Sequence, residues 1–374
     1  MPEVATAQPA FTAQPASTAE AAEIMREAAR DDLAVLIRGG GTKLDWGVPP
    51  RRVDLILDTR KLTGIVEHAA GDLITVVRAG TTMESLADGL KPQQLALDAP
   101  LPGATVGGTV AVNTSGPRRM LYGTTRDLLI GITVVRADGK IAHAGGKVVK
   151  NVAGYDLGKL FTGSYGTLGL ITECAFRLHP LPVARAVVRT HVRDPREAVT
   201  AVLGAQVVPS ALEINAPPGA KVEVAVLVEG SPAGVRDRAA TLEKLLGGET
   251  SDDPPEWWGC YPWRDGEVGV KLTAPLSKVP DLLAAAARAT VRGSAGTGVL
   301  YAAVDPASAP GVVERLRATA IRAGGHAVVL TAPPGVREVL DMWGPVAGLA
   351  LMRRVKDQFD PGHRLAPGCF VGGI

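Results

Sequence analysis

The chain has 374 residues, with 40 Lys or Arg against 38 Asp or Glu and a formal net charge of +2. Because positive and negative charges are nearly equal in number, the composition gives no electrostatic basis for binding nucleic acid. No apolar run in the sequence reaches the length of a membrane span. The length is sufficient for two domains with sizeable cores. The N-terminus has no charged start followed by an apolar core. We therefore expect no signal peptide and a cytoplasmic protein.

The metal-ligating residue types are sparse. The three cysteines, Cys174, Cys260 and Cys369, are too few and too widely spaced to hold an iron–sulfur cluster or a structural zinc ion by themselves. The six histidines form no i,i+4 pair and no H-E-x-x-H motif. We therefore expect no metal site in this chain and three reduced thiols.

The N-terminal half predicts a mixture of helices and strands. Residues 1–16 are rich in Ala, Pro, Thr and Gln and are predicted to form a flexible tail. Ser17 with Glu20 and Thr81 with Glu84 have the spacing of capping boxes, each of which predicts the start of a helix. The predicted elements are helices over 21–30 and 84–90, strands over 34–37, 53–57, 64–68 and 73–78, and a hairpin of 128–136 with 141–144.

A second α+β region is predicted after the proline-containing segment 179–182. Its pattern consists of helices over 196–203, 233–246, 279–287 and 311–323, and strands over 211–215, 222–229, 268–273, 298–304 and 327–331. This alternation favours a ferredoxin-like arrangement. The predicted organisation is a tail (1–16), a first domain (17–182), a second domain (183–335) and a C-terminal segment that returns to the first domain (336–374).

Three glycine-rich segments lie in the first domain: R-G-G-G-T at 38–42, P-G-A-T-V-G-G-T at 102–109 and G-S-Y-G-T-L-G-L-I-T at 163–172. Glycine lets a backbone approach a ligand closely, and consecutive free N–H groups bind anions. The spacing does not fit a dinucleotide fingerprint, because Leu44 stands where the third glycine belongs, or a P-loop, because Leu160 follows Gly158 and Lys159. We expect one large phosphate-bearing cofactor held by the backbone.

Further motifs follow in a fixed order: N-T-S-G at 113–116, Y-G at 122–123, K-N-V-A-G-Y-D at 150–156 and V-K-D-Q-F-D-P-G at 355–362. With them, residues 18–182 resemble the FAD-binding domain of the vanillyl-alcohol oxidase family, also called the PCMH type. The resemblance implies an α+β fold, in which a two-part PCMH-type FAD-binding domain is followed by a ferredoxin-like α+β cap domain over the flavin. It also implies FAD as the cofactor. The residues it places at the cofactor are Arg38, Gly39, Gly40, Gly41, Thr42, Pro102, Gly103, Ala104, Thr105, Gly107, Gly108, Asn113, Gly116, Tyr122, Gly123, Lys150, Gly154, Tyr155, Asp156, Gly166, Gly169 and Ile171.

Some of these residues have a second interpretation. Arg38 offsets phosphate charge or is a surface charge, Tyr155 touches the cofactor or packs in the core, and Asn113 reaches the flavin ring or forms a turn. Some members of the family attach the flavin covalently through a His in the first glycine segment. That segment has no His here, and Lys43 follows Thr42, so we expect non-covalent FAD.

The cap region departs from the family pattern. Relatives that oxidise 2-hydroxy acids carry G-H-x-G-D-G-N-x-H there, which supplies histidines for a metal and for catalysis. The matching stretch, 293–301, keeps the glycines but has Ser294 and Tyr301 in place of the histidines, and Thr297 and Val299 in place of Asp and Asn. Since no metal ligand and no obvious general base remain, the catalytic residues stay unassigned.

Two cations resemble the positions that hold a substrate carboxylate in the same relatives. They are Arg264, after a pair of tryptophans, and Lys271, on the strand that follows. Both residue types pair with carboxylates, although Arg264 with Asp265 also fits a solvated charge pair. Near the C-terminus A-P-G at 366–368 replaces the family's N-P-G, which keeps the turn and removes the amide.

Within the family the chain resembles the FAD-binding E subunit of bacterial glycolate oxidase. That resemblance implies a subunit of a complex that oxidises glycolate to glyoxylate together with a catalytic flavin subunit and an iron–sulfur subunit. In this interpretation the chain binds FAD and supports or relays electrons. The alternatives are a free-standing FAD-dependent dehydrogenase or oxidase of another 2-hydroxy acid such as D-lactate, and a flavin-binding structural partner without a redox role.

Overall fold

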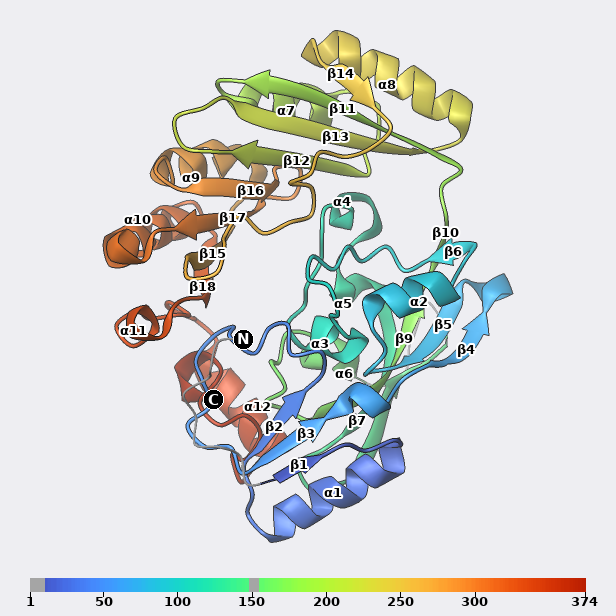
Figure 1. The fold of residues 1–374 in the computed structure, drawn as a ribbon, viewed down its shortest axis with the longest axis vertical. Helices are drawn as coiled ribbons and strands as arrows, with labels where there is room; N and C mark the ends of the chain where they lie inside the picture. Colours follow the sequence, from blue (N-terminus) through green and yellow to red (C-terminus); the bar gives the residue numbers. More distant parts are fainter. Residues whose placement is uncertain (1–10, 148–154) are drawn as a thin grey trace. The chain divides into compact units, whose positions relative to one another are not determined.

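A computed structural model describes residues 11–147 and 155–374 (Figure 1). The chain forms two compact units. The first combines Met1–Ser115, Thr124–Leu181 and Pro345–Ile374, and the second combines Gly116–Gly123 with Pro182–Gly344. The sequence assigned 116–123 to the first domain and 336–344 to the returning segment, whereas the structure places both in the second unit. Lys150 and Gly154 lie outside the described residues.

A three-stranded parallel sheet opens the first unit, in the order β1-β3-β2. Its strands are β1 (Phe11–Ala13), β2 (Val35–Arg38) and β3 (Leu55–Asp58). The expectation of a flexible tail is therefore wrong for residues 11–13, because β1 pairs in register with β3. Helix α1 (Thr18–Arg30) follows β1, and its N-cap is Ser17, whose side chain accepts the N–H of Glu20.

A five-stranded antiparallel sheet forms the larger part of the first unit, in the order β4-β5-β9-β7-β8. Its strands are β4 (Ile65–Ala69), β5 (Ile74–Arg78), β7 (Leu129–Val135), β8 (Ile141–Gly145) and β9 (Leu170–Arg177). Two short strands, β6 (Gln93–Gln94) and β10 (His179–Pro180), pair separately. The third glycine segment thus runs directly into the central strand β9.

Helices connect these strands. Besides α1, the helices of the first unit are α2 (Met83–Gly89), α3 (Val106–Ala111), α5 (Thr125–Leu128), α6 (Leu157–Phe161) and α12 (Leu349–Phe359). Its single turns of 3-10 helix are η1 (Thr59–Lys61), η2 (Ala70–Asp72) and η5 (Val371–Gly373). The N-cap of α2 is Thr82 and not the expected Thr81. Thr81 is buried and accepts the N–H of Gly64, while Glu84 accepts the N–H of Gly103 in the second glycine segment.

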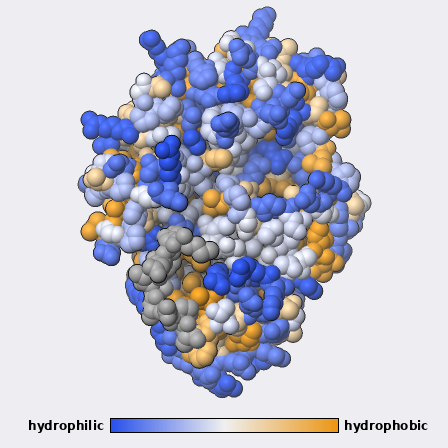
Figure 2. All heavy atoms as spheres, viewed as in Figure 1, coloured by the Kyte–Doolittle hydropathy of each residue, from blue (hydrophilic) through white to orange (hydrophobic). Residues whose placement is uncertain are grey.

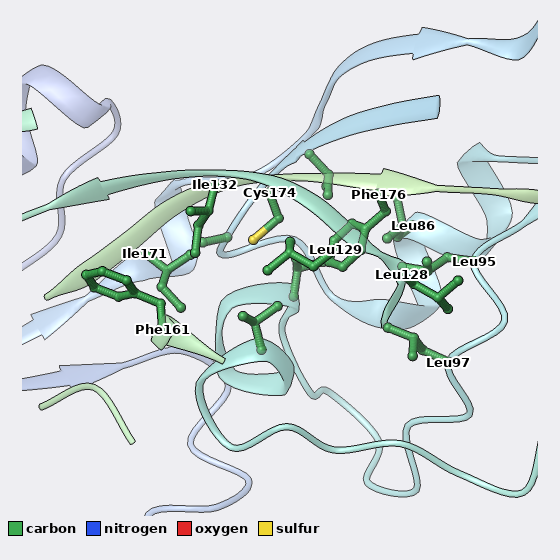
Figure 3. Close-up of a cluster of buried hydrophobic side chains, with 14 of the residues drawn as sticks. Leu86, Leu95, Leu97, Leu128, Leu129, Ile132, Phe161, Ile171, Cys174 and Phe176 are labelled. Atoms are coloured by element: carbon green, nitrogen blue, oxygen red, sulfur yellow. The ribbon is translucent and has the colours of Figure 1, made fainter. Parts of the chain in front are cut away.

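The core of the first unit is a cluster of buried apolar side chains between the five-stranded sheet and the helices. It includes Leu86, Leu95, Leu97, Leu128, Leu129, Ile132, Phe161, Ile171, Cys174 and Phe176. Figure 3 shows these labelled side chains gathered between the strands and a helix. Cys174 is fully buried here, and burial raises the pKa of its thiol. It is therefore a packing residue.

The second unit is built on an eight-stranded antiparallel sheet, in the order β14-β11-β13-β12-β16-β17-β15-β18. Its strands are β11 (Ala184–Val192), β12 (Ala211–Ala216), β13 (Val222–Gly230), β14 (Glu249–Ser251), β15 (Val268–Thr273), β16 (Thr290–Ser294), β17 (Val299–Val304) and β18 (His326–Thr331). Its helices are α4 (Arg119–Tyr122), α7 (Pro195–Gly204), α8 (Pro232–Leu246), α9 (Val279–Ala285), α10 (Ala309–Arg322) and α11 (Pro334–Arg337), with turns η3 (Leu276–Lys278) and η4 (Pro306–Ser308).

This sheet consists of two successive β-α-β-β-α-β repeats. β11 to β14 with α7 and α8 form the first, and β15 to β18 with α9 and α10 form the second. Each repeat has its first strand between its third and fourth, and the two repeats join through their second strands, β12 and β16. This duplicated ferredoxin-like order was only half visible in the sequence, because β11, β14 and β16 were not predicted.

The two faces of the sheet differ. Side chains alternate between faces along each strand, so Leu212 and Ile214 of β12 lie on one face and Glu213 and Asn215 on the other. Helices α7 and α8 contact the first repeat and α10 contacts the second (Figure 1). The loop of residues 252–267 contacts the face of Glu213, where Trp257 and Trp258 pack on an apolar cluster with Ala225. We call this the polar face.

The surface carries its apolar residues in small separate areas. Figure 2 shows hydrophobic patches scattered among hydrophilic residues on the visible face. Exposed large apolar side chains include Val183 and Val339. Among the helices that the structure describes, none has the length and apolar character needed to cross a membrane.

Candidate functional site

A pocket in the first unit brings the three glycine segments together. Its lining includes Gly39, Gly40, Gly41 and Thr42 from the first segment, Thr105, Gly107 and Gly108 from the second, and Gly166, Gly169 and Ile171 from the third. These segments are separated by more than fifty residues each in sequence, so their convergence is a property of the fold. The walls between them include apolar residues of β2 and α3 and Ala79, which directly follows β5.

The first glycine segment presents free backbone donors to this pocket. In the described part of the chain, the N–H groups of Gly39, Gly40, Gly41 and Thr42 have no protein acceptor. Gly40 and Gly41 are exposed and Gly39 and Thr42 are half-buried, and four consecutive N–H groups without a protein acceptor beside a pocket form a site that suits anionic oxygens. This arrangement fits the pyrophosphate of a dinucleotide cofactor.

Glycine is required here by close approach. A Cβ at Gly39 would lie 2.3 Å from Thr105 Oγ1, and a Cβ at Gly40 would lie 2.0 Å from the carbonyl oxygen of Gly103. The first and second segments therefore touch through their backbones. Gly103 contributes this contact although it does not line the pocket, and Pro102 and Ala104 do not line the pocket either.

The second segment divides between structure and pocket. Thr105 caps α3 by accepting the N–H of Gly108. A Cβ at Gly107 would meet the Cβ of Ala79 at 2.8 Å, so this glycine is needed for packing on β5. A Cβ at Gly108 would meet only Thr105 Oγ1, at 3.2 Å, and otherwise open space. Because Gly108 lines the pocket, it is the position where a side chain would enter it.

Arg38 is held by a carboxylate. Its guanidinium donates to Asp58 Oδ2 at 2.8 Å, and Arg60 donates to the same carboxylate at 2.7 Å. Asp58 is fully buried. Burial alone would raise its pKa, but the hydrogen bonds from Arg60 and Arg38 outweigh burial and hold the pKa well below the usual range. Arg38 thus orients the end of β2, just before the first glycine segment.

Lys43 contributes a positive charge to the lining of the pocket. Its ammonium lines the pocket and donates to Thr42 Oγ1 at 3.3 Å, and no described carboxylate lies within 4.0 Å of it. Burial lowers the pKa of Lys43 to about 8. A buried ammonium without a counter-ion is suited to a phosphate. The sequence showed Lys43 only as a neighbour of the glycine segment, and nothing in the spacing indicated its burial.

Asn113 lies beside the pocket in a constrained conformation. Its φ is +53°, and its side-chain Oδ1 is buried with no hydrogen-bond partner among the described residues. The preceding residues, Ala111 and Val112, line the pocket. An orphaned buried amide oxygen at this place is suited to accept a hydrogen bond from a bound ring, which is the first of the two interpretations given for Asn113. The positive φ is the conformation of a turn residue, which is the second.

Other predicted cofactor residues lie elsewhere. Tyr155 is 92 % exposed, so it does not pack in the core. Asp156 caps α6 by accepting the N–H of Lys159. Gly116, Tyr122 and Gly123 belong to the second unit, where the Tyr122 hydroxyl donates to Glu229 at 3.2 Å. These positions do not line the pocket of the first unit.

A buried ion pair ties the C-terminal helix to the pocket. Lys356 Nζ donates to the Asp360 carboxylate at 2.7 Å and to the carbonyl oxygens of Thr167 and Leu365 at 2.8 and 3.0 Å. Both charged side chains are fully buried. Thr167 lies within the third glycine segment, and Ala366, next to Leu365, lines the pocket. The pair therefore positions two walls of the pocket. In the sequence, Lys356 and Asp360 were visible only as part of the motif at 355–362.

Cys369 also lines the pocket. Burial raises the pKa of its thiol to about 12, so it is protonated at neutral pH and a poor nucleophile. Among the residues that the structure describes, no three His, Cys, Asp or Glu side chains come together in a way that could hold a metal ion.

The two cations expected at a substrate lie in the second unit. Lys271 is half-buried on β15, directly opposite Tyr301 of β17. Arg264 is exposed in the loop on the polar face, and its backbone N–H donates to Glu267. The stretch 293–301 forms the hairpin of β16 and β17. Its glycines have structural causes, because a Cβ at Gly298 would lie 2.0 Å from the carbonyl oxygen of Ala274.

Comparison with known proteins agrees with this pocket. Residues 9–145 match a family described as FAD binding domain. The chain is 33% identical over 231 residues to the glycolate oxidase subunit GlcE of Escherichia coli, covering 61% of this chain and 63% of that protein. It is 39% identical over 160 residues to a D-lactate dehydrogenase of Archaeoglobus fulgidus, covering 42% of this chain and 36% of that protein. The chain thus spans less than two thirds of the length of either relative.

The fold extends the likeness to nearly the whole chain. The structure of p-cresol methylhydroxylase with bound substrate superposes with a TM-score of 0.74 at 18% identity, covering 96% of this chain and 88% of that one. The chain therefore has the α+β fold of the vanillyl-alcohol oxidase, or PCMH-type, structures, and the match to the family described as FAD binding domain is limited to residues 9–145.

Proposed function

We propose that this chain is an FAD-dependent oxidoreductase subunit that acts on the CH–OH group of 2-hydroxy acids. The observation that carries the proposal is the row of four unpaired N–H groups, Gly39 to Thr42, in a pocket shared by three glycine segments. Bound FAD would supply a two-electron acceptor. In such a reaction the substrate loses a hydride from carbon to the flavin and a proton from its hydroxyl, and becomes a 2-oxo acid.

The residues present fit FAD at its charged end. The free N–H groups and the Lys43 ammonium would hold the pyrophosphate, and Arg38 would act by fixing the segment that carries them. Asn113 Oδ1 would accept from the ring system. The protonated Cys369 thiol and the absence of His from the first glycine segment support non-covalent attachment.

For the biological role we propose a subunit of a glycolate oxidase complex that works with a catalytic flavin subunit and an iron–sulfur subunit. The likeness to GlcE supports it, and so do Ser294 and Tyr301 at positions where catalytic relatives have histidines. The chain would then bind FAD and support or relay electrons. The second candidate is a free-standing dehydrogenase of a 2-hydroxy acid, which the likeness to a D-lactate dehydrogenase favours.

One experiment tests the proposal at both levels. The purified full chain should be yellow and should release intact FAD on acid denaturation. Anaerobic addition of glycolate or D-lactate to the isolated chain should leave the flavin oxidised, while addition to the native complex should reduce it. Rapid bleaching in the isolated chain would favour the free-standing enzyme. A chain that takes up no FAD would contradict the proposed function altogether.

A further inference from the structure

A cluster of cations surrounds Tyr301 on the polar face of the second unit. β17 lies between β15 and β16, and Tyr301 is directly opposite Lys271 on one side and Arg292 on the other. Directly opposite residues of antiparallel strands project to the same face. The Tyr301 side chain is therefore flanked by a cation on each side.

A third cation comes from the segment 116–123. Arg119 donates through Nη2 to the Tyr301 hydroxyl at 3.3 Å and through Nε to the carbonyl oxygen of Gly116 at 2.9 Å. On the other side, Arg292 donates to Asn215 Oδ1 at 2.9 Å and to the carbonyl oxygen of Tyr261 at 3.3 Å. Arg119 thus contacts the Tyr301 hydroxyl, while Arg292 lies beside Tyr301 on the neighbouring strand.

That aromatic group provides a wall between the cations. The rings of Tyr261 and Trp263 stack at 4.4 Å, and the Tyr301 ring meets Tyr261 edge-on at 4.9 Å. Trp263 also fills the space over Gly269, where a Cβ would be only 2.6 Å from the indole. The wall is apolar in the middle and charged at its margins.

The charges of this cluster are not balanced. None of Arg119, Lys271 and Arg292 forms an ion pair with a described carboxylate within 4.0 Å. The carboxylate that acts on Arg119 is Glu213, which is buried. All three cations are half-buried. Burial lowers the pKa of Arg292, while at Arg119 burial is outweighed by Tyr301 and Glu213, which raise the pKa.

We infer that the cluster of Arg119, Lys271 and Arg292 around Tyr301 binds a dicarboxylate, with one carboxylate toward Arg119 and Lys271, the other toward Arg292, and the carbon chain against the aromatic wall. Because Lys271 and Arg292 lie on strands at opposite sides of Tyr301, the arrangement favours two separate carboxylates over one compact dianion such as phosphate. This site is a ligand site of the second unit, and it is argued independently of the reaction proposed above.

The test is isothermal titration calorimetry of the FAD-loaded full chain at constant ionic strength. Succinate and glutarate are the dicarboxylate probes, and propionate and butyrate are the matched monocarboxylates. We expect at least tenfold tighter binding of the dicarboxylates. Arg119→Gln and Lys271→Gln should each weaken succinate binding roughly tenfold, the effect of losing one charge-assisted hydrogen bond. The same variants should change propionate binding much less than succinate binding.

Arg185→Gln is the control, because Arg185 lies on the same sheet and forms an exposed ion pair with Asp253. It should bind succinate as the parent does. If Arg119→Gln fails to fold, Lys271→Gln and Arg119→Lys still decide the matter. Equal affinities for succinate and propionate, inorganic phosphate binding as tightly as succinate, or an equal loss in Arg185→Gln would overturn the inference.

The test of the dicarboxylate site and the test of the proposed function can fail independently of each other. Flavin reduction by glycolate in the native complex together with equal affinities would refute the dicarboxylate site alone. Selective succinate binding that depends on Arg119, in a chain whose flavin no hydroxy acid reduces in the complex, would refute the proposed reaction and leave the site intact.

Discussion

The two charged sites of this protein are made in opposite ways. The pocket of the first unit offers backbone N–H groups of Gly39 to Thr42 and one ammonium, Lys43. The cluster of the second unit offers side chains from three adjacent strands and from the segment 116–123. A backbone site depends on loop conformation and close approach, and it fixes the sequence as glycine. A side-chain site depends on strand register, and it does not require glycine at its positions.

This difference predicts that the pocket is sensitive to remote supports. Lys356→Met should lower the free energy of unfolding of the first unit by about 3–5 kcal/mol, because it leaves the buried Asp360 carboxylate without its counter-ion. Chemical denaturation followed by circular dichroism measures this. The control is Lys278→Met, which breaks an exposed ion pair with Asp281 and should cost at most about 1 kcal/mol. Similar losses in the two variants would mean that Lys356 does not support the pocket.

A side chain placed inside the backbone site should remove the cofactor and not the fold. Gly108→Val should weaken FAD binding by about 10–100-fold, since overpacking a tight space costs roughly 1–3 kcal/mol. FAD fluorescence titration of the apoprotein gives the dissociation constant. Gly71→Val is the control, because nothing lies within 4 Å of its added Cβ. Unchanged FAD affinity in Gly108→Val would place the cofactor away from α3.

The same contrast explains how far the sequence could be interpreted. Ser17, the glycine segments and the hairpin of β7 and β8 were predictable because they are local: a cap, a close approach and a turn each leave a residue signature. The expectation for Thr81 failed because the cap depends on the path of the chain before α2, and tertiary contact buried Thr81 instead. Strand β16 was missed because Arg292 and Gly293 give it no alternating pattern.

The residues of the two charged sites also divide into those with a local sequence signal and those without one. The glycines of the pocket were predicted from the three glycine-rich segments and the family resemblance that they carry, whereas Lys43 and Cys369 enter it through burial that no local pattern shows. Arg119 could not be connected with Tyr301, because the two are 182 residues apart in sequence and only the fold joins them. Residues recruited by register or by chain crossing need the structure.

Lys43 gives the backbone site a pH dependence. In the free protein its pKa is about 8, lowered from 10.5 by burial. A bound pyrophosphate would favour the charged ammonium and raise this pKa, so FAD affinity should be highest below about pH 8 and fall as the pH rises above it. The same group makes the stability of the apoprotein rise with pH between about pH 8 and pH 10.5, because there the unfolded chain binds more protons than the folded one.

Lys43→Met should therefore weaken FAD binding at pH 7 by about tenfold, the loss of one charge-assisted interaction. It should also flatten the profile of FAD affinity between pH 7 and pH 9.5. The exposed Lys61 serves as the control, and Lys61→Met should keep both the affinity and the profile of the parent. Parallel pH profiles for Lys43→Met and the parent would show that the ammonium does not meet the phosphates.

The smallest effect is expected at Arg264, at the margin of the side-chain site. Arg264 is exposed and acts on Arg292 as a like charge, which disfavours the Arg292 guanidinium and attracts an anion at the same time. Because solvent screens exposed charges, Arg264→Gln should weaken succinate binding by only about two- to threefold, compared with roughly tenfold for Lys271→Gln. Calorimetry at low and at high salt separates the two effects. The loss of affinity in Arg264→Gln should vanish at about 0.5 M salt, where exposed charges are screened within a few ångströms. The loss in Lys271→Gln should persist at that salt concentration. A loss at Arg264 as large as that at Lys271 would move the anion from the sheet to the loop, and would make Arg264 a primary ligand of the carboxylate.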